Sequence, residues 1–319
     1  MTTQADPSRT QPVPLAEQPL ASPFAGGGLV EVFRRRYLLK LLVRKAVRSR
    51  YQGSVLGLFW SYIQPLVRFC MYFFVIGLVL GLHKNLPNFA IHMFAAIVGV
   101  HFFTETFSSG TRSIISNKAI VRKMAMPREM FPVAAVITSA INTFPQLVIL
   151  FVGSLAVGWK PDPMGLLAGV LGIAIVIVLG TALALLFSGM NVFFRDFQNI
   201  VQTFMLFTHW IVPMIYPFYK LAQSGLGRNT AFYDAYLSNP LTVAVLLLQR
   251  AFWIPTTLGK RGYPGPGRRF PDNASDVGFP VLPHHYMLLG WGMLAVSLVI
   301  LVLCQMVFRS IEGKFAERL

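Results

Sequence analysis

Charge is scarce in this chain, and acidic residues are the scarcest. Of 319 residues only 12 are Asp or Glu and 13% are charged, whereas 55% are hydrophobic and the mean hydropathy is +0.58. Soluble domains carry about 25% charged residues. The composition therefore excludes a soluble protein and predicts an all-α integral membrane protein.

Cysteine and nucleotide-binding motifs are also missing. The two cysteines, Cys70 and Cys304, both fall within apolar runs, which excludes a disulfide framework or a CxxC metal site. The histidines lack metal-ligand spacing, so we predict no metal site. No GxxxxGK[ST] occurs anywhere in the sequence, so we expect no enzyme activity and no cofactor on this chain.

Six apolar segments reach the roughly 20 residues that a membrane-spanning helix needs. They are residues 56–82, 89–109, 133–157, 164–190, 200–219 and 286–308. A seventh run, residues 239–254, is too short to cross, which suits a re-entrant or interfacial helix. It lies in a long loop, residues 220–285, that also holds an irregular Gly-Pro-rich insertion at 262–271.

Basic residues orient these spans. Eight Lys or Arg lie between Arg34 and Arg50 and five between Arg112 and Arg128, whereas the two short loops on the other side hold only Lys84 and Lys160. Because short cytoplasmic loops are enriched in Lys and Arg, both termini are predicted to be cytoplasmic. In a soluble protein the net charge of +16 would suggest nucleic acid, but here membrane topology accounts for it, so we expect no nucleic-acid partner.

The N-terminal region changes character near residue 29. Residues 1–28 are rich in Pro, Gln, Ser and Gly and are predicted to be a disordered cytoplasmic tail. From 29 to 50, apolar residues share one helical face, opposite a basic face. That basic face is formed by Arg34, Lys40, Arg44, Lys45 and Arg48. The pattern predicts a helix in the headgroup layer, with an ordinary basic flank as the alternative.

Two residues of the Asp, Glu, Lys and Arg types lie within predicted spans, where charge is costly and marks a function or a pair. Arg68 is in the first span and Glu105 is in the second. The helical rise places them within reach of each other, because an Arg side chain can extend along the membrane. We predict an Arg68–Glu105 ion pair, with separate contacts to water or headgroups as the alternative.

Several sequence motifs together resemble a known family. They are RYQGSVLGLFWSYIQPLVRFCMYFFVIGLVLG at 50–81, NKAIVRKMAMPREMFPVAAV at 117–136, NVFFRDFQNIVQ at 191–202 and PMIYP at 213–217. In order and spacing they resemble the ABC-2 type permeases that export polysaccharides such as O-antigens, teichoic acids and cell-wall galactans. The resemblance covers about residue 29 to the C-terminus.

This resemblance implies an architecture and partners. The family has an amphipathic interface helix, six spans, a cytoplasmic coupling helix between spans two and three, and short external gate helices before the last span. It implies a homodimer with two separate ATP-binding subunits, which would bind ATP and Mg²⁺. It further implies a polyprenyl-diphosphate-linked polysaccharide as substrate, and a place in the bacterial plasma (inner) membrane, in contact with its lipids.

The coupling helix is expected at about residues 117–125. Under the resemblance, its apolar residues Ile120, Val121 and Met124 pack into a cleft of the ATP-binding subunit, while Lys118, Arg122 and Lys123 make polar contacts around it. The alternative is a basic loop that only sets topology.

Aromatic residues in the first span are candidate channel-lining groups, because aromatic faces bind sugar without demanding one hydrogen-bond pattern. They are Phe59, Trp60, Tyr62, Phe69, Tyr72 and Phe73. Phe204, Phe207, Trp210 and Tyr216 offer a similar set near the fifth span. An interfacial aromatic belt or ordinary helix packing is the alternative.

The sequence is compatible with two other functions. An ion-coupled or energy-independent flippase for lipid-linked glycan would use intramembrane carboxylates, of which Glu105 is the candidate. A membrane glycosyltransferase would be expected to carry an acidic motif in an external loop, and the acidic residues outside the spans are scattered. Within the permease interpretation, the Pro-rich tail and the Gly-Pro-rich loop favour a galactan as the exported polymer.

Overall fold

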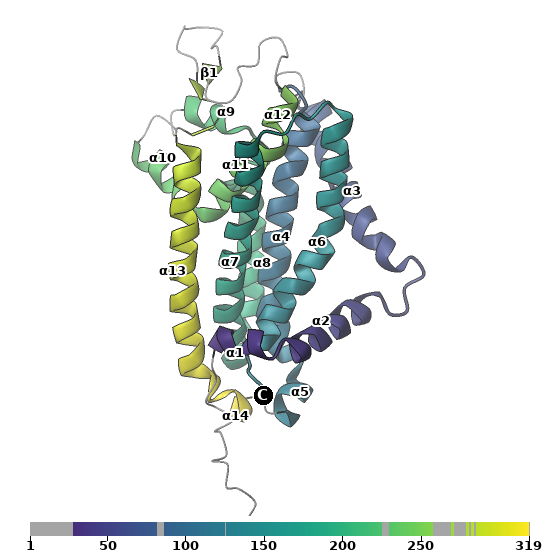
Figure 1. Ribbon diagram of the computed structural model, residues 1–319, viewed down its shortest axis with the longest axis vertical. Helices are drawn as coiled ribbons and strands as arrows, with labels where there is room; N and C mark the ends of the chain where they lie inside the picture. The colour runs from purple at the N-terminus through teal and green to yellow at the C-terminus, as the bar shows by residue number, and fades with distance from the viewer. Residues whose placement is uncertain are drawn as a thin grey trace, which may run out of the picture.

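The computed structural model describes residues 28–81, 86–124, 126–224, 230–257, 269–270, 279–280, 282–283 and 285–318. The predicted tail lies outside these residues except for Gly28, and so does most of the 262–271 insertion. The described chain is a bundle of long helices (Figure 1). The protein is an all-α integral membrane protein, with five helices long and apolar enough to cross a membrane among the described residues.

These five helices match five of the predicted spans. The first is α3 (Trp60–Tyr72), preceded by a 3₁₀ turn, η1 (Gly57–Phe59), and continued by a π-helix, η2 (Phe73–Val79). The other four are α4 (Phe89–Ser116), α6 (Met130–Ala156), α7 (Pro163–Phe193) and α13 (Tyr286–Glu312). Helix α7 is central and packs against α4, α11 (Pro240–Phe252) and α13.

The predicted fifth span, residues 200–219, was wrong in its extent. Helix α8 runs only from Phe197 to Ile211, and its 15 residues cover about 22 Å, short of the hydrocarbon thickness. The chain turns extended at Val212 and then meets Pro213, which cannot donate to the helical ladder. The hydroxyl of Tyr216 donates to the carbonyl oxygen of Ile211 at 2.9 Å, which satisfies one group that the helix end exposes.

The predicted short helix near residue 239 is re-entrant. Helices α10 (Thr230–Leu237) and α11 meet at a bend of 77°. The elements on either side, α9 (Phe218–Gln223) and α12 (Ile254–Thr257), lie at the same end of the molecule (Figure 1). Every residue of α11 from Leu241 to Ala251 is buried, so this helix is part of the bundle core. If the bent pair counted as one span, the described chain would have six.

Close packing between α7 and α11 depends on small residues. A methyl group at Gly172 would lie 2.8 Å from the backbone carbonyl oxygen of Ala244, and one at Gly169 would lie 2.9 Å from the Cβ of Ala251. No side chain fits between these backbones without moving one of them. Glycine therefore sets the distance between the central helix and the re-entrant one.

The predicted interface helix is present as two pieces, α1 (Gly28–Arg34) and α2 (Arg36–Tyr51), with a break at Arg35. Val32 and Leu39 are buried in a cluster with the first turns of α6. From there α2 extends away from the bundle (Figure 1). Its apolar face thus packs partly on this chain.

The two ends of the molecule carry different elements. Helices α1, α2, α5 (Lys118–Lys123) and α14 (Phe315–Arg318) lie at one end, called here the α5 end. Helices α9 and α12 lie at the other, the α12 end, with two short antiparallel strands, β1 (Arg269–Phe270) and β2 (Phe279–Pro280).

Candidate functional site

Three polar cavities meet around the middle of α4. The α2 cavity, about 290 Å³, lies among α2, α4 and α6 and is lined by Lys45, Arg50 and several Ser and Thr hydroxyls. The α6 cavity, about 260 Å³, is bounded by α2, α3, α4 and α6. The α8 cavity, about 460 Å³, lies among α3, α4 and α8. Polar groups at this depth are costly unless they serve a function.

Three residues are shared between the cavities. Arg50 lines both the α2 and α6 cavities, Glu105 lines the α2 and α8 cavities, and His101 lines the α6 and α8 cavities. His101 and Glu105 lie one helical turn apart on α4, so one face of this helix borders all three spaces. Arg50, His101 and Glu105 thus lie at the junction between the α2 cavity and the space beside α8.

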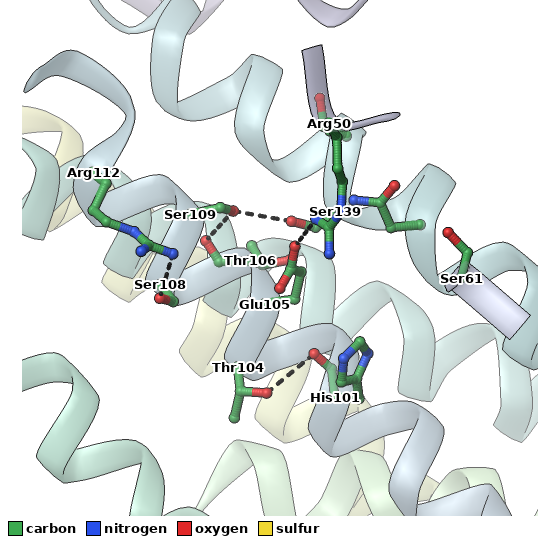
Figure 2. Close-up of polar contacts among 12 residues, drawn as sticks. Arg50, Ser61, His101, Thr104, Glu105, Thr106, Ser108, Ser109, Arg112 and Ser139 are labelled. Atoms are coloured by element: carbon green, nitrogen blue, oxygen red, sulfur yellow. Dashed lines mark hydrogen bonds and ion pairs between the residues drawn. The ribbon is translucent and has the colours of Figure 1, made fainter. Parts of the chain in front are cut away.

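Arg50, and not Arg68, forms the ion pair with Glu105. The Arg50 guanidinium donates to the Glu105 carboxylate, and Figure 2 shows the two side chains meeting. The prediction of Arg68 was wrong because it considered only the spans, whereas the end of α2 brings a second arginine to α4. Arg68 lines the α8 cavity with Glu105, but no ion pair within the described residues includes it.

Hydrogen bonds hold the other polar groups around this junction. The Gln146 amide lies 2.9 Å from His101 Nδ1, which links α6 to α4. The hydroxyls of Ser109 and Ser139 are 3.0 Å apart and link the same helices (Figure 2). Bonds of this kind orient buried polar groups and restrict their movement.

The predicted channel aromatics divide into three groups. Trp60 lines the α6 cavity and Tyr72 lines the α8 cavity. Phe69 and Phe73 instead pack on α4, where Phe69 meets the Phe94 ring edge-on at 5.1 Å. Phe59 and Tyr62 are exposed on the outer surface of the described chain.

The second predicted set, near α8, is also divided. Trp210 lines the α8 cavity, and Phe204 packs against Phe107. Phe207 is exposed, and the hydroxyl of Tyr216 donates to the carbonyl oxygen of Ile211 at the end of α8.

The basic face of the interface helix is exposed in the structure. All five predicted residues are exposed: Arg34, Lys40, Arg44, Lys45 and Arg48. Lys45 also donates to the side-chain oxygen of Asn117 at 3.1 Å, which joins α2 to the residue before α5.

The predicted docking helix is shorter than expected, and one of its residues is turned inward. Helix α5 covers Lys118–Lys123 instead of residues 117–125. Val121 is buried in a cluster with Phe308 and Phe315 of this same chain, so its side chain is less accessible than the docking prediction assumed. Ile120 packs half-buried beside that cluster. The exposed residues are Lys118, Arg122, Lys123 and Met124.

An ion pair at the α12 end, between the buried Arg250 and the partly exposed Asp162, was not predicted. The Arg250 guanidinium donates to both carboxylate oxygens of Asp162, at 2.9 and 2.6 Å, and its Nε donates to the Tyr286 hydroxyl at 3.2 Å. Asp162 also accepts from the backbone N–H of Gly165, so it caps α7. The hydrogen bonds from Arg250 lower the pKa of the Asp162 carboxyl below its usual value. The signal in the sequence was a single charged residue, Arg250, in a mostly apolar helix.

Comparison with known proteins identifies the family. Residues 37–251 match the model of the ABC-2 type transporter membrane family, so the chain belongs to that family and is a multi-pass membrane protein. It is similar to an O-antigen export system permease protein, RfbA, from Myxococcus xanthus, at 28% identity over 59% of this chain and 71% of the relative. A Klebsiella pneumoniae protein of the same name is 26% identical over 67% of this chain and 80% of that protein.

Proposed function

We propose that this chain is the transmembrane subunit of an ATP-driven exporter. It moves a polyprenyl-diphosphate-linked polysaccharide from the cytoplasmic to the outer face of the bacterial plasma membrane. The observation that carries the proposal is the α8 cavity, in which polar groups and two aromatic side chains, Tyr72 and Trp210, face one space between α3, α4 and α8. A surface of polar and aromatic groups suits a hydrated polymer that slides along it. The names of the relatives, which are O-antigen export permeases, support a polysaccharide as the cargo.

The energy comes from a separate ATP-binding subunit, because this sequence has no phosphate-binding loop of its own. Two copies of that subunit dock on a dimer of this chain. The exposed residues of α5 form the docking surface, and Lys118, Arg122 and Lys123 make it basic. The same positive charge supports a cytoplasmic α5 end, and hence cytoplasmic termini.

The α2 cavity receives the diphosphate of the lipid carrier. Lys45 supplies positive charge, and hydroxyls such as those of Ser109 and Ser113 supply donors. The exposed basic face of α2 attracts anionic headgroups toward it. The Arg50–Glu105 pair then lies between this entry and the α8 cavity. A cell-wall galactan remains the polymer that the sequence favours.

Deleting the gene that encodes this chain tests the proposed function. Cells without it should accumulate the lipid-linked polymer on the cytoplasmic side, and expression of the chain together with its ATP-binding subunit should restore export. Export that requires ATP hydrolysis by that subunit supports the proposal. Export that continues without the ATP-binding subunit, and that stops when the proton gradient is collapsed or Glu105 is replaced by Gln, would instead support the ion-coupled alternative.

A further inference from the structure

The α6 cavity has features of a binding site for an uncharged polar ligand. It lies midway along α4 and α6, beside the path proposed for the polymer but on the α6 side of His101. Its walls combine the amide side chains of Gln64, Asn142 and Gln146 with the indole of Trp60. Nothing in the proposed function so far uses it.

Two buried amides that line this cavity each have one hydrogen-bonded atom and one atom without a partner among the described residues. Asn142 is 5% exposed and accepts a hydrogen bond from the Tyr51 hydroxyl at 3.2 Å, while its Nδ2 has no partner among the described residues. Gln146 is 1% exposed and bonds His101 through Nε2, while its Oε1 has no partner there. Buried polar groups in proteins are nearly always paired. The lining of this cavity therefore holds one donor and one acceptor that no described residue satisfies.

The charges around the cavity select the chemistry of that ligand. Its cation, Arg50, is already paired with Glu105, so an anion finds no uncompensated positive charge here. A lipid tail would leave both amide groups unpaired. A ligand with several hydroxyl groups satisfies them, because each hydroxyl both donates and accepts.

The remaining walls suit the apolar face of a sugar ring. Trp60 is 44% exposed and borders the cavity, so its ring is available for stacking. Pro65 has no N–H, so it cannot bond the carbonyl oxygen of Ser61 one turn before it, and both residues border the same space. The site thus offers an aromatic face together with donors and acceptors, the combination that a neutral pyranose presents in return.

We propose that the α6 cavity is a sugar-recognition site, in which the amides of Gln64, Asn142 and Gln146 bind hydroxyls of one residue of the polymer and Trp60 stacks on its ring. This inference rests on the proposed function and deepens it. It makes the exporter selective for its glycan, and not only for the lipid carrier.

The test uses the full complex of this chain with its ATP-binding subunit in nanodiscs. Two probes are compared: the lipid-linked polymer extracted from cells that lack this chain, and the same carrier lipid after removal of its glycan. The measured quantity is the concentration of each probe that gives half-maximal stimulation of ATP hydrolysis. The variants are Asn142→Leu and Gln146→Leu, which remove the amides, and Gln64→Leu, whose exposed side chain can be changed without disturbing the core.

Thr143→Val is the matched control, because Thr143 is on the same helix but lines a separate apolar cavity. We expect the three leucine variants to raise the half-maximal concentration of the lipid-linked polymer about tenfold, because each removes one hydrogen-bonding group from the site. The half-maximal concentration of the glycan-free lipid should change by less than about twofold, which is smaller than the effect of losing one hydrogen bond. Thr143→Val should resemble the wild type with both probes.

Two results would overturn the sugar site while leaving the exporter intact. One is an equal rise of the half-maximal concentration for both probes. The other is an unchanged half-maximal concentration in Gln64→Leu and also in Asn142→Leu or Gln146→Leu. If the wild-type complex responds to neither probe, the proposed function itself fails. Recovery of the assembled complex and its thermal unfolding midpoint show which variants are folded. If Asn142→Leu and Gln146→Leu do not fold, the half-maximal concentration measured for Gln64→Leu alone decides whether the sugar site exists.

Discussion

Arg50, at the end of α2, forms an ion pair with Glu105, 55 positions later in the middle of α4. The pair joins a helix at the α5 end of the molecule to the centre of the bundle, where the three cavities meet. The pair is therefore a direct contact between α2 and the middle of α4. In the proposed exporter, this link connects the lipid-binding entry with the path beside α8.

A double-mutant cycle measures this pair. We expect Arg50→Gln and Glu105→Gln to show a coupling free energy of about 1 kcal/mol, since both side chains are partly exposed and solvent screens them. Thermal unfolding in nanodiscs provides the measurement. The cycle of Arg68→Gln with Glu105→Gln is the control and should give no coupling; a larger value there than for Arg50 would contradict the pairing.

The Asp162–Arg250 pair should stabilise the re-entrant helix. Asp162→Asn leaves Arg250, whose side chain is 5% exposed, without its carboxylate. Removing one partner of a buried pair costs about 3–5 kcal/mol, and the partial exposure of Asp162 should bring the loss nearer to about 2 kcal/mol. Denaturant unfolding of the purified chain checks this value. Asp234→Asn, at an exposed position on α10, is the control and should change the stability little.

The same pair predicts a pH dependence. Because Arg250 lowers the pKa of Asp162 in the folded chain, the stabilisation is complete above the ordinary Asp pKa and is lost as the pH falls through the lowered value. Acidification below about pH 4 should thus lower the unfolding midpoint more in the wild type than in Asp162→Asn. Parallel curves for the two proteins would show that the pair does not contribute.

Gly172 should not tolerate a side chain. Gly172→Ala places a methyl group against the Ala244 carbonyl oxygen, and overpacking of this kind costs about 1–3 kcal/mol. Gly292→Ala is the matched control, because a methyl group there meets nothing within 4 Å and should be neutral or slightly stabilising. The thermal unfolding midpoints of the two variants provide the measurement. Equal midpoints would mean that α7 and α11 can separate without cost.

The two faces of α5 should respond differently to substitution. Lys123→Glu changes an exposed residue, so we expect weaker, salt-dependent recovery of the ATP-binding subunit and an unchanged unfolding midpoint. Val121→Ala removes packing against Phe308 and Phe315 and should destabilise the chain by about 1–2 kcal/mol.

Lys160→Glu, at the α12 end, is the control for charge reversal at α5 and should leave recovery of the ATP-binding subunit unchanged. Loss of recovery in Lys160→Glu equal to that in Lys123→Glu would argue against docking at α5.

The long apolar runs were sufficient to predict α4, α6, α7 and α13. A helix satisfies its backbone hydrogen bonds within its own segment, so length and hydropathy identify a span without knowledge of its neighbours. The interface helix was equally visible, because one strip of apolar residues opposite a basic one is a local property. The end of α8 was missed, although Pro213 marked it, because the apolar run continued past that proline.

Contacts between distant segments depended on the tertiary structure. Asp162 and Arg250 are 88 positions apart, and neither residue alone indicates that the re-entrant helix brings them together. Glu105 was identified as a paired carboxylate, but only the position of α2 selected Arg50 over Arg68. Val121 has the apolar character of a docking residue, and only the tertiary structure showed that it lies in a buried cluster with Phe308 and Phe315. By itself, the sequence determined which segments are helices, because helical hydrogen bonds and hydropathy are local. Which side chains meet was decided by the tertiary structure, because those meetings depend on how the helices pack.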